Sequence, residues 1–163
     1  MNNVTKELIA RGFSDAGYKD ATDAQGMFYK KVTEDSTFVI GVHQVEDMTA
    51  FTANMPTIWS AEVDVVLARD INDNGKMLRA IVTDDGLAFL YPFYMGCTHN
   101  EGRIAREFAG QLEATIGKIA KAISDYQKEQ EAKGKPDDSK AAQEAETVRR
   151  VIHLANEFLR AKP

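Results

Sequence analysis

The sequence predicts an α+β domain: a five-stranded antiparallel sheet packed with a short N-terminal helix and a long C-terminal antiparallel helical hairpin. Two segments, a hairpin at 26–45 and a meander at 59–94, show the period-two alternation and the turn residues that are typical of strands. Beyond residue 98 the apolar spacing changes to three or four, which is the spacing of an amphipathic helix.

The meander is the best-specified part of the predicted core. Apolar and polar residues alternate over 59–67, turn-forming residues follow at 70–75, and the Asp-Gly pair at 85–86 is a strong hairpin signal between strands at 77–84 and 87–94. This register places nine apolar residues on one buried face: Val63, Val65, Leu67, Leu78, Ala80, Val82, Phe89, Tyr91 and Phe93.

The other face of the meander is more apolar than a solvent-exposed sheet face should be. The predicted register places Met77, Ile81, Leu90 and Tyr94 there. A sheet face in water is mostly polar, so we expect this one to be covered, either by the C-terminal helical hairpin or by a partner chain. These four residues are the predicted partner interface.

The N-terminal segment predicts a short helix that is capped by Asn3 or Thr5 and runs to about Arg11, with Gly12 as its stop. Residues 13–25 are interpreted as a loop.

Residues 27–33 and 37–45 form the predicted first hairpin, in a register that leaves the direction of His43 open. The segment 46–57 is harder to assign. Its larger apolar residues, Met48, Phe51 and Met55, fall at helical spacing, which indicates a helix of one or two turns before Pro56.

The C-terminal third predicts two helices. Regular apolar spacing over 104–126 indicates a long helix that ends near Ala132. Residues 134–138 interrupt it, and a heptad-like seam over 141–159 predicts the second helix. Because the connecting loop is short and polar, the two helices are expected to form an antiparallel hairpin.

Composition and charge limit the location and the partners. The chain has 163 residues and one cysteine, Cys97, which excludes an intramolecular disulfide and fits a reducing cytoplasm. Its longest uncharged apolar run is much shorter than the ~20 residues of a membrane span. We therefore expect a cytoplasmic protein without membrane contact.

The net charge of −5 is unevenly distributed. Residues 1–97 hold 8 Lys and Arg against 14 Asp and Glu, whereas residues 98–163 hold 12 against 11. We expect an acidic α+β sheet region followed by the helical hairpin, both within one domain. The acidic balance argues against direct nucleic-acid binding, which needs clustered Lys and Arg.

One segment has the beginning of a calcium-binding pattern. Asp70, Asn72 and Asn74, followed by Gly75, match the first six positions of an EF-hand loop. The twelfth position is Ile81 instead of Glu, and the predicted flanks are strands. A hairpin turn is therefore the favoured interpretation, and no metal or cofactor is expected.

Cys97 and His99 are the candidate catalytic residues, with His43 as an alternative partner for the cysteine. A thiolate and an imidazole could act as nucleophile and base, or as zinc ligands. The sequence has no Cys-x-x-Cys or paired-His motif. We therefore interpret Cys97 as a small buried residue and His99 as a surface residue, and we expect no catalytic site.

These observations favour a non-enzymatic cytoplasmic protein-binding module, chaperone-, adaptor- or inhibitor-like, which acts through a sheet face or the helical hairpin, often as a homodimer. One alternative is an acidic nucleic-acid mimic that inhibits a DNA- or RNA-binding protein. Its surface would consist of Glu62, Asp64, Asp70, Asp73, Asp84 and Asp85. The other alternative is a small enzyme that uses Cys97 with His99 or His43.

At the level of fold class alone, a small acidic α+β chain resembles secretion chaperones and bacteriophage-encoded inhibitors of host machinery. No sequence motif supports this analogy, and the predicted order of strands and helices departs from the chaperone pattern.

Overall fold

The computed structural model describes residues 1–74, 77–94, 100–133, 146, 149, 150 and 153. The helices are α1 (Asn3–Asp15), α2 (Ala61–Asp73) and α3 (Glu101–Lys133), and the strands are β1 (Lys19–Asp20), β2 (Met27–Val32), β3 (Thr37–Val45), β4 (Met48–Pro56), β5 (Arg79–Thr83) and β6 (Gly86–Tyr94). As far as they are described, none of these helices has the length and apolar composition needed to cross a membrane.

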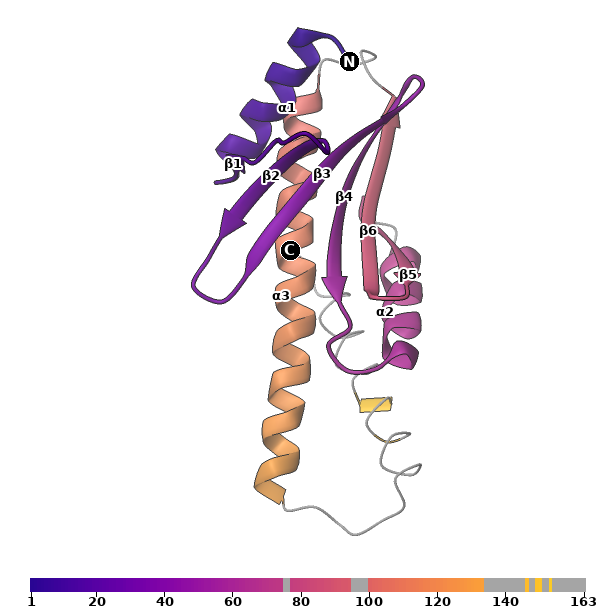
Figure 1. Cartoon of the computed structure of the whole chain (residues 1–163). Helices are drawn as coiled ribbons and strands as arrows, with labels where there is room; N and C mark the ends of the chain where they lie inside the picture. The colour runs from indigo at the N-terminus through magenta and orange to yellow at the C-terminus, as the bar shows by residue number, and fades with distance from the viewer. Residues whose placement is uncertain (75–76, 95–99, 134–145, 147–148, 151–152, 154–163) are drawn as a thin grey trace.

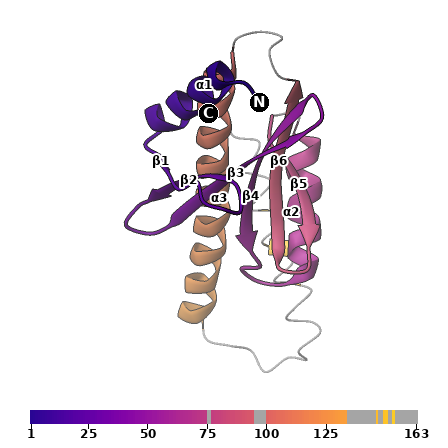
Figure 2. The same ribbon diagram turned by 45° about the horizontal axis from the view of Figure 1, so that its top comes forward.

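Within the described residues, the six strands form one antiparallel sheet in the order β1-β2-β3-β4-β6-β5. The helices α1, α2 and α3 contribute to one core on the inner face of this sheet: α1 packs on α3, and α2 lies beside β5 and β6 (Figure 1, Figure 2). The outer face carries exposed side chains such as Val39, His43 and Ile81. No helix among the described residues covers that face (Figure 1).

Phe51 of the central strand β4 occupies the middle of the aromatic core. Its ring centroid lies 5.1 Å from that of Phe13 in α1, 4.9 Å from Phe93 in β6 and 5.7 Å from Phe108 in α3. Because Phe13, Phe51 and Phe108 are fully buried, these contacts join two helices to the sheet.

The first strand predicted for the meander is wrong, because residues 61–73 form α2. The Ser60 hydroxyl accepts a hydrogen bond from the Val63 N–H at 3.3 Å and caps the helix, as serine commonly does. Val63 and Leu67 are four residues apart and therefore satisfy a helical face as well as a strand face. Val65 distinguishes the helix from the strand. The predicted strand would bury its side chain, whereas in α2 this side chain is 55% exposed.

The short helix predicted within 46–57 is also wrong, because this segment is the central strand β4. The inner-face residues of β4 are Thr49, Phe51, Ala53 and Met55, and all are buried. Thr and Ala are weak apolar signals, so the helical spacing of the three larger residues concealed the alternation. The segment of α2 removes one predicted strand, and β4 and β1 add two, so the sheet has six strands within the described residues instead of the predicted five.

The hairpin of β5 and β6 is confirmed, with its turn displaced by one residue. Thr83 pairs with Gly86 across a turn at Asp84 and Asp85, and Ala80 pairs with Phe89. The pairing differs by two residues from the predicted register, so each side chain keeps its face. Of the nine residues predicted for the buried face, Val63, Leu67, Leu78, Ala80, Phe89 and Phe93 are buried, Tyr91 is half-buried, and Val65 and Val82 are exposed.

The N-terminal helix extends further than predicted. Its cap is Asn2, whose side-chain oxygen accepts from the Thr5 N–H at 2.8 Å. Gly12 lies inside α1 where the helix crosses α3, and a Cβ at this position would overlap the carbonyl oxygen of Gly102. The predicted stop is therefore a close contact between two helix backbones.

The long helix α3 is confirmed. Most of the predicted second helix of the hairpin lies outside the described residues. The structure describes four residues of it, all helical: Glu146, Arg149, Arg150 and His153. The Arg150 guanidinium lies 3.4 Å from the Glu129 carboxylate of α3.

Candidate functional site

The outer edge of β5 is partly closed by a side chain of α2. The Asn72 amide group donates to the carbonyl oxygen of Ala80 and accepts from its N–H, both at 2.8 Å. In this way the side chain takes the place of a neighbouring strand at one residue. α2 therefore both packs beneath β5 and blocks the first part of its edge.

The same two bonds show which residues of β5 direct their backbone N–H and carbonyl groups to the free edge of the strand. In an antiparallel sheet, successive residues direct their backbone groups to opposite sides of the strand. The backbone N–H and carbonyl of Ala80 point toward α2. Those of Ile81 therefore bond to β6, and those of Val82 point away from β6 again. No group of the described residues bonds to the outward N–H and carbonyl of Val82.

Apolar side chains flank this open backbone. Ile81 is 55% exposed on the outer face, and Val82 is 39% exposed on the inner face. Val65 lies seven residues before Asn72 and so shares its helix face, which lies along the edge. The opposite edge of the sheet differs, because β1 has two residues and both, Lys19 and Asp20, are charged. Short, charged edge strands resist pairing with other chains, whereas longer apolar ones favour it.

Three of the four residues predicted as a partner interface are described with their side chains. Ile81 and Leu90 both lie on the outer face, but they are not opposite each other on neighbouring strands, because Ile81 pairs with Ala88. Met77 precedes β5 and packs against the buried core. The backbone of Tyr94 ends β6, opposite Met48, and its side chain lies outside the described part. At the β5 edge, Ile81 therefore lies on the outer face, and Val82 lies on the inner face, where α2 carries Val65.

The candidate catalytic residues Cys97 and His99 lie outside the described residues. His43 is exposed on the outer face, where Nε2 lies 2.9 Å from the Thr52 hydroxyl. Within the described ranges, no group of three or more His, Cys, Asp or Glu side chains is placed to hold a metal ion.

The residues of the calcium-like pattern do not lie in a turn between strands. Asp70 and Asn72 belong to the last turn of α2, and Asn74 caps it. The Asn72 side chain contacts Ala80, as described above, so the predicted hairpin turn at this position is wrong.

The acidic residues considered for a nucleic-acid mimic are divided between α2 and the β5–β6 turn. Asp64 is buried and accepts from the Thr57 hydroxyl at 2.6 Å. Glu62 and Asp73 are exposed on α2, and Asp84 and Asp85 are exposed at the turn.

A polar cluster missed by the sequence interpretation joins β2 to α3. Lys31 Nζ lies 2.7 Å from Glu113 Oε1 and donates to the Ala16 carbonyl at 3.0 Å, and the Tyr18 hydroxyl donates to Glu113 Oε2 at 3.3 Å. Burial raises the pKa of Tyr18 far above its usual value, and the charge and hydrogen bond of Glu113 add to this shift. These contacts among described residues join β2, the end of α1 and α3, so we interpret the cluster as a structural clamp.

No protein-family model matches the chain, and no match is found among curated proteins or among solved structures. The open edge of β5 is therefore interpreted from its own chemistry.

Proposed function

We propose that the protein is a cytoplasmic protein-binding module, with a role in binding instead of catalysis, that pairs with a second copy of itself through the open edge of β5. The observation that carries this proposal is the outward-facing backbone of Val82, flanked by the exposed side chains of Val65 and Ile81. A strand edge with apolar flanks is bound best by another strand edge with apolar flanks.

A second copy of the chain supplies both the strand edge and the apolar flanks. Two identical chains related by a two-fold axis present the same patch to each other, so a self-complementary patch is sufficient. With the axis at Val82, the N–H of each copy donates to the carbonyl of the other, as in a hydrogen-bonded antiparallel pair. The Asn72 side chain limits this pairing, because it occupies the neighbouring edge position at Ala80. The expected contact is therefore short, and its apolar side chains supply much of its affinity.

Pairing through β5 leaves the outer sheet face available for a protein partner. That face carries Leu90 and Ala88 beside the polar Thr52 and Asn54, a mixture that suits a protein surface better than a membrane. Two copies would form a continuous twelve-stranded sheet from two six-stranded ones, with one outer face on each copy.

Light scattering of the purified full chain tests the proposal. The wild type is expected to have the mass of a dimer, and Ile81→Asp is expected to be monomeric, because the substitution places a charge in the apolar contact. Residues at the centre of an interface that act as hot spots cost about 2 kcal/mol or more of binding free energy when they are truncated. A monomeric wild type would refute the proposal.

Val32→Asp is the matched control. Val32 is 69% exposed on β2, away from β5, so this variant adds the same charge without touching the proposed contact. It should remain a dimer. Circular dichroism of both variants should show folded protein, because neither side chain contributes to the core.

A further inference from the structure

The middle of the sheet contains a second open edge, where β3 and β4 separate. Their pairing runs from Val45–Met48 to Gly41–Thr52 and ends there. Both strands continue, β3 back to residue 37 and β4 on to residue 56, but these halves pair with β2 and β6 instead. Residues 37–40 and 53–56 therefore lie on either side of a V-shaped opening (Figure 1).

The backbone direction in this opening follows from the pairing across the sheet. The backbone N–H and carbonyl of Ala80 bond to Asn72 and not to β6. Phe89 lies opposite Ala80, so its backbone groups point away from β5 and toward β4. Ala53 then bonds to Phe89, and the next residue of β4, Asn54, faces the opening. The same alternation makes Gly41 bond to Thr52, so Val39 faces the opening from β3. The Ala21 N–H donates to the Phe28 carbonyl, as this alternation requires at the far side of the sheet.

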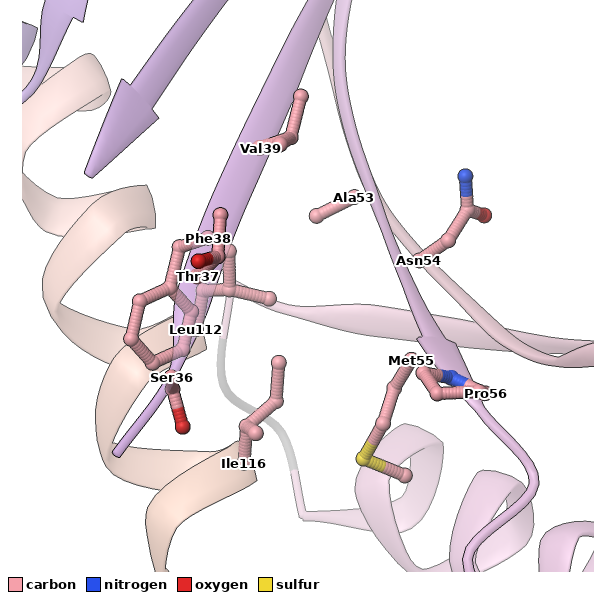
Figure 3. A pocket seen from close by; sticks show the side chains of 10 residues that line it. All are labelled: Ser36, Thr37, Phe38, Val39, Ala53, Asn54, Met55, Pro56, Leu112 and Ile116. Carbon is pink, nitrogen blue, oxygen red and sulfur yellow. The ribbon is translucent and has the colours of Figure 1, made fainter. Parts of the chain in front are cut away.

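Beneath the opening lies a partly open pocket of about 160 Å³ with a mainly apolar lining. Leu112 and Ile116 of α3 form its floor, and Phe38 and Met55 line it from the two strands (Figure 3). Leu112 and Met55 are buried, whereas Phe38 and Ile116 are half-buried. Small-molecule pockets usually measure about 300–1,000 Å³, so this volume suits one or two side chains better than a cofactor.

The wide end of the opening is acidic. The β2–β3 turn places Glu34 and Asp35 directly before Ser36, which lines the cavity. At the other side, the Thr57 N–H donates to the Asp85 carbonyl at 3.0 Å, which holds the turn of Asp84 and Asp85 next to Pro56. All four carboxylates are exposed. A ligand that enters here meets negative charge first and apolar surface second.

We propose that the opening between β3 and β4 binds an extended segment of a partner protein, with alternating apolar residues and Lys or Arg at the end nearest these turns. The segment adds as a strand that bonds to the backbone groups of Val39 and Asn54, and it places an apolar side chain on Leu112 and Ile116. The site is separate from the β5 edge, so it does not depend on pairing with a second copy.

A fluorescein-labelled peptide, Lys-Lys-Ser-Ile-Ser-Val-Ser-Ile-Ser, is the probe for anisotropy titrations with the full chain. Saturable binding is expected, and the same peptide with Glu-Glu in place of Lys-Lys should bind less tightly. Absence of saturable binding up to about 1 mM, the weak end of specific binding, would overturn the proposal.

Two proline variants separate this site from the β5 edge. Asn54→Pro removes the N–H that faces the opening, and it should weaken peptide binding about tenfold while leaving the oligomeric state unchanged. Val82→Pro removes the outward N–H of β5, and it should leave peptide binding unchanged. Peptide binding that resists Asn54→Pro but responds to Val82→Pro would place the peptide at β5 and refute the site.

Ile116→Trp is a second variant that does not alter a strand. The larger side chain occupies the cavity floor from the half-buried face of α3, so it should also weaken peptide binding. Amide exchange provides a direct readout: the peptide should slow exchange at Val39 and Asn54. Unchanged exchange at both amides with saturating peptide would count against strand addition.

Discussion

The Asn72 side chain binds the backbone of Ala80 at two points, and this contact links α2 to the edge of the sheet. Both hydrogen bonds measure 2.8 Å. An Asn side chain has a donor and an acceptor in the arrangement of a peptide group, so it can substitute for one residue of a missing strand.

Asn72→Asp should therefore destabilise the protein. The carboxylate accepts from the Ala80 N–H but cannot donate to its carbonyl, and the loss of one part-buried hydrogen bond costs about 0.5–1.5 kcal/mol. Urea unfolding measures the change in the free energy of unfolding. Asp73→Ala, at the exposed neighbouring position of α2, should change it by less than about 0.5 kcal/mol. Equal effects of the two substitutions would contradict the role assigned to Asn72.

Gly12→Ala should destabilise the contact between α1 and α3. The added Cβ would overlap the Gly102 carbonyl oxygen and lie 2.9 Å from the Ala105 Cβ, and both belong to a rigid helix. Overpacking of this kind costs about 1–3 kcal/mol. Gly110→Ala is the control, because a Cβ there has no atom within 4 Å, and alanine favours a helix over glycine by about 1 kcal/mol. Thermal unfolding should therefore shift in opposite directions for the two variants.

Alkaline pH should destabilise the protein through Tyr18. Burial and Glu113 raise the pKa of this hydroxyl on folding, so the folded state holds the proton more firmly than the unfolded chain does. The contribution is complete below the unfolded pKa of about 10, and it is lost as the pH rises above that value. Burial raises the pKa of Tyr29 as well, which acts in the same direction.

Urea unfolding between pH 8 and pH 11 measures this dependence. The free energy of unfolding of the wild type should fall toward pH 11, and that of Tyr18→Phe should fall less steeply, with Tyr29 responsible for part of the remaining slope. The two proteins would show parallel curves if Tyr18 had an ordinary pKa in the folded state.

The predictable parts of the fold are those whose sequence pattern fits only one type of secondary structure. The helix α3 has apolar residues three or four apart over several turns, and the β5–β6 hairpin has a strong turn signal, so both were predicted. The segment of α2 satisfies two patterns, since Val63 and Leu67 fit a strand and a helix. The cap at Ser60 was the signal that could have favoured the helix. In β4 the small residues Thr49 and Ala53 concealed the alternation.

The candidate site was only partly predictable. The apolar residue Ile81 was identified from the sequence, because an apolar side chain on a face that should be polar is a local signal. The importance of Val82 depends on β5 being the last strand of the sheet, and that position depends on β6 pairing with β4. The opening at Val39 and Asn54 depends on where two strands separate. Strand order and strand separation are set by long-range packing, which the local pattern does not specify.

Amide hydrogen exchange at Val82, measured at two protein concentrations, tests the central proposal most directly. Pairing through β5 places this N–H in a hydrogen bond to the second copy, so its exchange should slow as the concentration rises through the dissociation constant. The amide of Ile81, which is bonded to β6 in one copy, should exchange slowly at both concentrations. Exchange at Val82 that is independent of concentration, in a protein that light scattering shows to be dimeric, would place the interface elsewhere.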